Sequence, residues 1–229
     1  MFRSHHRDRI LPQFEHSLFS GLLAWHWGNA DFDRPALDFD AFARGVALHD
    51  WHYGPLDNHP LGEYDEAEWQ AIAERGVAMR YEDPVTDAVA KRHLRRLIGS
   101  PDAPQVRALA DRLNDLIAVR RAETPYSESD FEWADRITRF CDTVAFDLGF
   151  ENLGPRHAGV VAQRNDTRET PVTYAIEPSG MIRFHPWPFD CDRFSMPVTA
   201  YRGTGYPDRL EPLVTLVRCE PSDQPLTTR

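Results

Sequence analysis

The sequence predicts a mainly α protein, a bundle of about six helices with a small C-terminal antiparallel β-sheet packed against it. Apolar residues recur at helical spacing through the first two thirds of the chain, and short β-type runs with turn signals follow. The chain has 229 residues, of which 41% are hydrophobic, and this is enough for one substantial core. We therefore expect a single domain, in which a helical bundle over residues 1–153 carries a β-rich extension over residues 154–229.

The first three helices are predicted from an apolar stripe and from capping residues. Leu18 and Leu22 lie one turn apart on one helix face. Asp38 is a favoured N-cap residue directly before the second stripe, and Asp65 with Glu68 has the spacing of a capping box. The predicted helices cover residues 13–27 and 38–50 and a segment that begins at residue 65.

The next three helices are predicted in the same way. Asp83-Pro84 places a cap before a proline at the first helical position, and Gly99 ends that helix. Leu109 and Leu113 belong to the stripe of the fifth helix, and Gly149 follows the sixth. The predicted ranges are 83–99, 103–122 and 129–148.

Beyond Gly154-Pro155 the pattern changes to short strands. The predicted strands are residues 159–162, 172–176, 181–184 and 196–201. A stretch of about 70 residues with few large aliphatic side chains forms only a thin core, so we expect an antiparallel sheet that rests on the bundle. Residues 220–229 are expected to be a frayed tail.

Composition excludes several classes of function. The net charge of −10 disfavours the broad basic face that a nucleic-acid-binding protein needs. No apolar run is long enough to span a membrane, and the first twelve residues lack the apolar region of a secretory signal. The three cysteines form no CxxC pair and are typical of reduced thiols. The sequence therefore predicts a cytoplasmic protein without nucleic acid or membrane as its main partner.

Five polar residues are candidates for a common site. His16, His93 and Asp142 lie on or beside the apolar stripes of three predicted helices, and His49-Asp50 is at the end of a fourth. A buried imidazole or carboxylate is costly unless it is paired or ligated. A shared metal accounts for all five residues together, and such nitrogen and oxygen ligands suit Mn, Fe, Zn or, more weakly, Mg.

The order His…His-Asp…His…Asp on successive helices resembles the HD-domain superfamily of metal-dependent phosphohydrolases. The chain as a whole also resembles a bacterial family described as a domain of unknown function with HD-like features. The matching segments are residues 15–17, 27–28, 47–51, 92–94, 140–142 and 186–189. This resemblance implies an HD-like helical bundle and a metal-dependent phosphohydrolase.

By this resemblance, His16, His49, Asp50 and Asp142 would hold one divalent ion with two positions left for a water and a phosphoryl oxygen. His93 is predicted in the same cleft, although a one-metal site does not need it. Many HD hydrolases carry Glu or Lys shortly after the His-Asp pair, whereas this chain continues with Trp51 and His52. His52 is therefore the predicted acid–base residue beside the catalytic Asp50, with an ordinary loop residue as the alternative.

A basic run covers residues 91–96 in a chain that is otherwise acidic. Arg92 and Arg96 flank His93 and are the predicted ligands for the phosphate of a small phosphorylated molecule. The alternative is that these cations only favour the C-terminal end of their helix.

Two further functions stay open. In a dinuclear iron oxygenase, Asp50 would bridge two ions and His93 and His26 would complete the second position. In a non-catalytic binding module, the metal or ligand would be held without turnover. The sequence leaves open whether one or two ions are bound, and whether the chain forms a homodimer.

Overall fold

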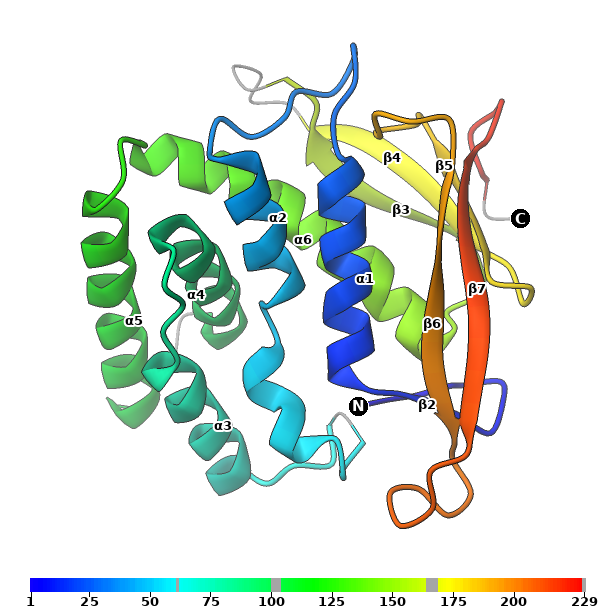
Figure 1. Cartoon of the computed structure of the whole chain (residues 1–229), viewed down its shortest axis with the longest axis horizontal. Coiled ribbons are helices and arrows are strands. Elements are labelled where there is room, and N and C mark those ends of the chain that lie inside the picture. Colours follow the sequence, from blue (N-terminus) through cyan, green and yellow to red (C-terminus); the bar gives the residue numbers. More distant parts are fainter. Residues whose placement is uncertain (61, 100–103, 164–168, 228–229) are drawn as a thin grey trace.

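The structure is a computed structural model that describes residues 1–60, 62–99, 104–163 and 169–227. Helices on one side meet a curled sheet on the other (Figure 1). With 45% helix and 22% strand, the protein is a mixed α and β structure, and the prediction of a mainly α bundle with a small sheet is wrong.

Three helices begin at the predicted caps Asp38, Asp65 and Asp83, whereas the sixth begins at Glu128, after a cap at Ser127 that the sequence analysis did not identify. The side chains of Asp38 and Asp83 each accept a hydrogen bond from the third residue of their helix, and Asp65 and Ser127 form capping boxes. The helices of the described chain are α1 (Gln13–His26), α2 (Phe39–Ala47), α3 (Glu66–Ala78), α4 (Pro84–Ile98), α5 (Pro104–Ala122) and α6 (Glu128–Phe150), with a 3₁₀-helix η1 (Trp51–Leu56). The predicted start of the fifth helix at Ala103 lies outside the described residues.

The second helix is shorter than predicted. It ends at Ala47, and a tightened turn carries the chain through His49 and Asp50 into η1. The amide of Leu48 donates to the carbonyl of Gly45, and the amide of His49 to that of Val46. The His-Asp pair therefore lies in the turn between two helical segments.

The sheet is larger than predicted and is not purely antiparallel. Its strands are β1 (Phe2–Arg3), β2 (Arg9–Leu11), β3 (Gly154–Val161), β4 (Glu169–Ile176), β5 (Met181–His185), β6 (Phe194–Arg202) and β7 (Pro212–Pro221). Their order is β1-β2-β6-β7-β5-β4-β3, and β5 pairs with β7 in parallel. Two strands thus come from the N-terminus, and β7 extends to Pro221 in the segment expected to be a frayed tail.

Helices and sheet share one core. α1 packs on β6, and α6 packs on β3 and β1, so these two helices lie between the sheet and the remaining helices (Figure 1). The ring of Phe140 in α6 lies 5.3 Å from that of Trp27 and 6.4 Å from that of Phe184 in β5. A second cluster around Leu94, Leu109 and Leu113 joins α3, α4 and α5.

Glu151 ties the end of α6 to the loop between β1 and β2. It follows α6 in the left-handed conformation, with φ of 56°. Its buried carboxylate accepts hydrogen bonds from Ser4, Arg7 and Arg9. This cluster fixes the N-terminal segment against the helical layer.

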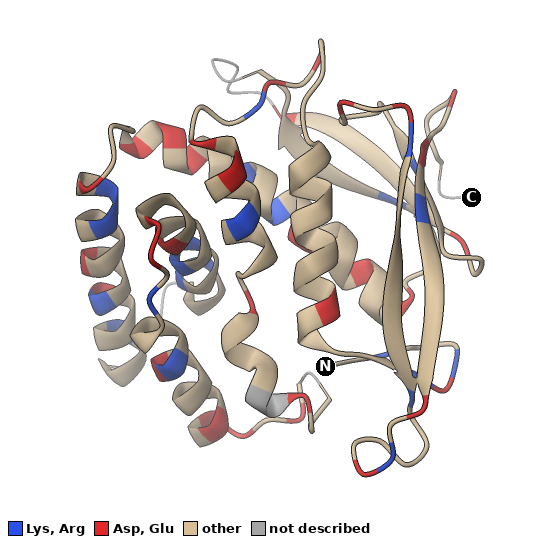
Figure 2. Ribbon diagram, in the orientation of Figure 1, with Lys and Arg blue, Asp and Glu red and all other residues tan. Residues whose placement is uncertain are grey.

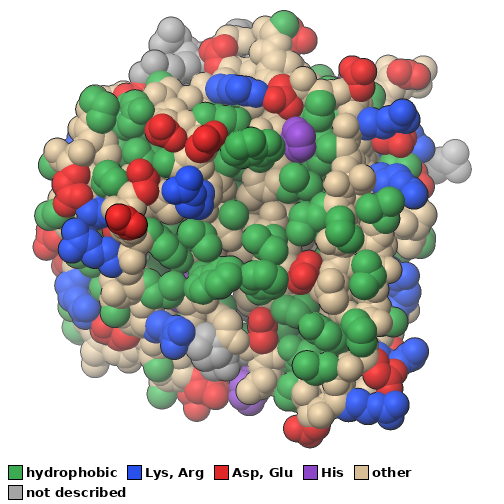
Figure 3. Space-filling view, in the orientation of Figure 1, with side chains coloured by type: hydrophobic (Ala, Val, Ile, Leu, Met, Phe, Trp, Pro, Cys, Tyr) green, Lys and Arg blue, Asp and Glu red, His purple; other side chains and the backbone are tan. Residues whose placement is uncertain are grey.

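The surface differs between helices. In Figure 2, α5 carries charges of both signs, whereas α1 is almost free of charge. Figure 3 shows hydrophobic side chains gathered across the middle of the face that is viewed in Figure 1. Phe14 and Trp25 of α1 and Trp51 of η1 are among the exposed apolar residues. No described helix is both long enough and apolar enough to cross a membrane.

Candidate metal centre

Four helical elements bring the predicted site residues together. His16 lies in α1, His93 in α4 and Asp142 in α6, and His49 and Asp50 lie in the turn after α2. The helical stripes that place these side chains inward are those on which the sequence prediction depended. His16, His49 and His93 are each about 1% exposed, and Asp50 is 5% exposed. The polar groups therefore meet in the interior, where each needs a partner.

The central feature is a group of four possible ligand atoms, which we call the four-atom set. Its members are Nε2 of His16, Nε2 of His49, Oδ2 of Asp50 and Oδ1 of Asp142. Nε2 of His16 lies 3.3 Å from Nε2 of His49 and 3.1 Å from Oδ1 of Asp142. Oδ2 of Asp50 lies 3.6 Å from Nε2 of His16 and 3.5 Å from Nε2 of His49. Ligands about 2.0–2.2 Å from a cation lie roughly 3.0–3.6 Å from one another in octahedral or tetrahedral geometry. This donor set therefore fits one cation at its centre.

The hydrogen bond of His49 sets its tautomer for ligation. Its Nδ1 lies 2.6 Å from the carbonyl oxygen of Val46, so Nδ1 carries the proton and donates it there. A cation among these atoms would displace any proton from Nε2 and bind its lone pair. Histidines that bind a metal commonly donate their other ring N–H to a backbone carbonyl, which fixes the orientation of the ring. The ring of His16 packs instead on Phe2, with ring centroids 4.7 Å apart.

The electrostatics of the cluster favour ionised carboxylates. Burial raises the pKa of Asp50, but the neighbouring imidazoles of His49 and His93 lower it by more, so its pKa is below the ordinary range. Burial likewise opposes the low pKa of Asp142, which the charge of His93 and hydrogen bonds to His16 and His49 hold well below normal. Burial lowers the pKa of His49, yet the two carboxylates raise it to about 9. The two ionised carboxylates therefore stabilise positive charge within this cluster.

His93 lies beside the four-atom set rather than in it. Nη2 of Arg96 donates to Nδ1 of His93 at 2.8 Å, so the proton of the neutral ring is on Nε2. This Nε2 lies 2.9 Å from Oδ1 of Asp50, whose other oxygen belongs to the set. We interpret His93 as the residue that orients Asp50. Arg96 also reaches Asp142, with Nη2 3.7 Å from Oδ2, and pairs with Asp135.

His52 is buried and lies outside the four-atom set. Its ring lies against Gly76 of α3 and against Tyr53, whose ring centroid is 4.4 Å away. Burial lowers the pKa of His52 to about 4, so the ring is neutral near pH 7. Its predicted acid–base role stays a prediction.

Arg92 is also apart from the four atoms. It pairs with Glu128, and its guanidinium lies over the ring of Phe131, 5.4 Å from the centroid. Together with Arg95 and Arg96 it lines a pocket of about 430 Å³ between α4, α5 and α6, which we call the arginine pocket. The sequence analysis missed Arg95, although positions 92, 95 and 96 share one helix face within the basic run.

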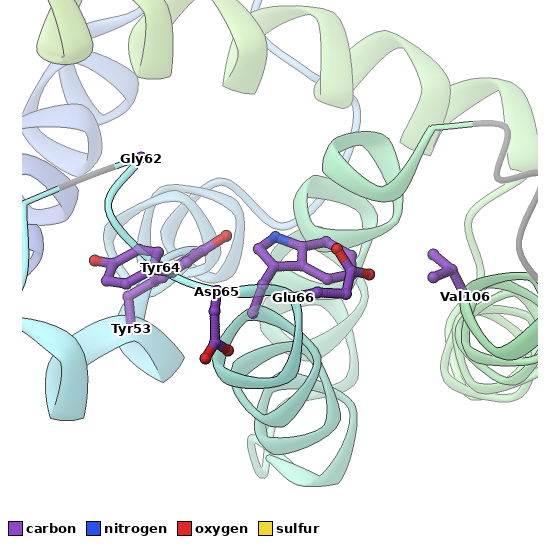
Figure 4. A pocket seen from close by; sticks show the side chains of 7 residues that line it. Tyr53, Gly62, Tyr64, Asp65, Glu66 and Val106 are labelled. Carbon is purple, nitrogen blue, oxygen red and sulfur yellow. The ribbon is translucent and has the colours of Figure 1, made fainter.

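A second pocket of about 470 Å³ adjoins η1 and the start of α3 (Figure 4). Tyr53, Tyr64 and Trp69 supply aromatic walls, and Asp65 and Glu66 supply carboxylates. None of the described residues that line this pocket is cationic. An anionic group is therefore accommodated better in the arginine pocket.

The comparisons with known proteins give one result. A family described as "Protein of unknown function (DUF3891)" matches residues 3–202, which include every residue of the four-atom set. Neither the curated proteins nor the solved structures give a match. None of these comparisons links the chain to the HD superfamily.

Proposed function

Because this chain belongs to the DUF3891 family of proteins of unknown function, its activity has to be inferred from the site, and we propose a metal-dependent hydrolase of HD type that acts on a small phosphoester. The observation that carries the proposal is the four-atom set itself. Two imidazole nitrogens and two carboxylate oxygens from His16, His49, Asp50 and Asp142 converge within 4.8 Å of one another in the interior. Two buried carboxylates need compensating positive charge, which a bound metal ion would supply.

His16, His49, Asp50 and Asp142 would hold one divalent ion. The mixed nitrogen and oxygen donors suit Mn, Fe or Zn, and Mg less well. A bound ion of this kind lowers the pKa of a coordinated water and polarises a phosphoryl oxygen. The His-Asp pair and the helical order of the four residues are also the features on which the HD assignment is based.

The arginine pocket would bind the phosphate group. Asp142 is the most exposed of the four ligands, with its side chain 18% exposed. Arg96 lies between this carboxylate and the pocket, since it contacts Asp142 on one side and lines the pocket on the other. Arg92 and Arg95 add two further cations. Guanidinium groups bind phosphate oxygens in pairs, and this favours a phosphorylated substrate over a neutral one.

The residues around the ligands hold the geometry. Nε2 of His93 lies 2.9 Å from Oδ1 of Asp50, so His93 would orient this carboxylate and leave its other oxygen for the cation. Arg96 fixes the tautomer of His93. His52 would act as the acid–base residue, and with a pKa of about 4 it would serve as a neutral imidazole. Replacement of His52 by Gln tests this role, because it should lower kcat and leave metal content unchanged.

The test is metal content and turnover measured on the same samples. Untagged protein is supplied with Mn²⁺, freed of excess ion, and assayed for bound metal and for hydrolysis of a chromogenic phosphomonoester. Wild type should bind and hydrolyse, and Asp50→Asn should lose both. Asp111→Asn is the control, because it removes an exposed carboxylate of α5 outside the site.

Three results would overturn the proposed hydrolase. Hydrolysis that survives Asp50→Asn would show that the site is not responsible. Metal binding without turnover of any phosphoester in a broad panel would favour a non-catalytic binding module. Two bound irons with consumption of oxygen would favour the dinuclear oxygenase.

A further inference from the structure

A second cluster of metal-ligand residues lies where the C-terminal end of α1 meets the loop between β5 and β6. The backbone amide of Asp190 donates to the carbonyl of His26 at 2.8 Å, and the amide of Gly28 to that of Pro188 at 2.9 Å. These bonds join two segments that are far apart in the sequence. They bring the side chains of His26, Asp190 and Cys191 to one place.

The three side chains present three kinds of donor atom at ligand spacing. Nδ1 of His26 lies 3.2 Å from Oδ1 of Asp190 and 3.4 Å from Sγ of Cys191. All three atoms lie within 4.8 Å of one another. Zinc bonds of about 2.0–2.3 Å in tetrahedral geometry place neighbouring ligand atoms roughly 3.3–3.8 Å apart, close to the spacing seen here. The spacing therefore fits a tetrahedral ion.

Each donor is held by a second contact. Nη2 of Arg34 lies 2.5 Å from Oδ2 of Asp190, which leaves Oδ1 directed at His26. The ring of His26 stacks on Phe194, with ring centroids 4.3 Å apart. Trp187 donates from Nε1 to the carbonyl of Cys191 at 2.5 Å. Contacts of this kind orient ligands in metal sites before the ion binds.

We propose that His26, Asp190 and Cys191 form a site for a thiophilic divalent cation, with Zn²⁺ as its natural occupant and water as fourth ligand. The side chains of His26 and Asp190 are 23% and 33% exposed, so an ion can reach them from solvent. Binding releases the thiol proton to solvent and leaves a thiolate–metal bond. The bound ion connects α1 to the β5–β6 loop.

This site is separate from the metal centre described above. His16 and His26 are ten residues apart in α1, which corresponds to roughly 15 Å along the helix axis. The donor sets also differ in chemistry, since the first has no sulfur. A probe that reports metal–thiolate bonds therefore detects the second site alone.

The experiment is a Co²⁺ titration of the full chain, followed by absorbance. Wild type should develop a sulfur-to-cobalt charge-transfer band in the near ultraviolet that saturates with one site, and Zn²⁺ in excess of both metal sites should abolish it. Asp50→Asn should retain the band, because it removes only the first site. Cys191→Ser should lose the band, whereas Cys219→Ser, at a buried cysteine of β7, should retain it.

The proposal would be overturned by the absence of this band in wild type at saturating Co²⁺, or by a band that persists in Cys191→Ser. His26→Gln provides a second variant with all thiols intact. It should weaken Co²⁺ binding at this site at least tenfold, with an unchanged circular dichroism spectrum. Unchanged binding in His26→Gln would also contradict the site.

Discussion

Gly21→Ala should separate α1 from α2 and thereby loosen the metal centre. A Cβ atom on Gly21 would lie 2.4 Å from Cβ of Ala47 and 2.7 Å from its Cα. Carbon atoms in ordinary contact are about 3.5–4.0 Å apart, so the two helices would have to move apart by roughly 1 Å. His16 lies on the first of these helices, and His49 follows the second by two residues. The Nε2 atoms of the two imidazoles, now 3.3 Å apart, would move with them.

Both stability and metal affinity should fall. Overpacking costs about 1–3 kcal/mol, and a contact with helix backbone belongs at the upper end of this range. Alanine is more favourable than glycine inside a helix by up to about 1 kcal/mol, which offsets part of this loss of stability. The net loss of about 2 kcal/mol corresponds to roughly 4–8 °C in Tm for a chain of this size. Metal affinity should fall at least tenfold, because ligands that are displaced by about 1 Å no longer share one ion.

Thermal unfolding by circular dichroism and Mn²⁺ binding by calorimetry measure these two effects. Gly54→Ala is the matched control, because a Cβ atom at this glycine of η1 would meet nothing within 4 Å. It should change neither quantity appreciably. An unchanged or raised Tm in Gly21→Ala, together with wild-type affinity for Mn²⁺, would refute the packing argument.

The remaining predictions concern charge and orientation. Burial raises the pKa of Glu151, but hydrogen bonds from Arg7 and other groups hold it below its ordinary 4.5. Glu151→Gln should therefore destabilise the protein near pH 7. The difference in stability from wild type, measured by urea unfolding, should shrink below about pH 4.5. His93→Gln should weaken Mn²⁺ binding by about 10–100-fold without abolishing it, as expected for a residue that orients a ligand. Arg92→Ala should raise KM for a phosphomonoester and leave metal content unchanged. Arg112→Ala, which breaks an exposed ion pair between α5 and Glu74 of α3, should change neither.

Each of these predictions has a result that contradicts it. A stability difference for Glu151→Gln that is the same at pH 7 and pH 3 would show that its carboxylate charge is not the cause. Complete loss of metal in His93→Gln would make His93 a direct ligand. A fall in kcat with unchanged KM in Arg92→Ala would exclude simple phosphate binding.

The helical half of the fold was predictable because its signals are local. Asp38, Asp65 and Asp83 each satisfy the first amides of a helix, and the geometry of these caps depends on only a few consecutive residues. The inward placement of His16 and Asp142 follows from helical spacing in the same way. These signals define helix ends and faces without reference to the rest of the chain.

The full extent of the sheet was not predictable because several of its pairings are distant in sequence. β1 and β2 contain two and three residues, which is too short for an alternating pattern, and they exist because Ile10 pairs with Tyr201. β7 pairs in parallel with β5, from Met181 opposite Arg218 onward, and no local signal specifies this pairing. The fold class was therefore wrong, although most helices were correct.

The site shows the same division. Helical stripes predicted which polar side chains face inward, but not the partners that orient them. The donation from Arg96 to His93, which fixes the tautomer, depends on the rotamers of both side chains. The joining of His26 to Asp190 and Cys191 depends on a contact between α1 and the β5–β6 loop, and the sequence pattern gives no sign of it.

Anomalous diffraction from crystals grown with Mn²⁺ would locate the ion at the metal centre. A single peak should lie about 2.0–2.3 Å from Nε2 of His16, Nε2 of His49, Oδ2 of Asp50 and Oδ1 of Asp142, with His93 hydrogen-bonded to Asp50 outside the coordination sphere. The same crystals of Asp50→Asn should lack this peak. Wild-type crystals in which the four side chains pair directly with one another, with no anomalous peak among them, would contradict the assignment of a metal centre.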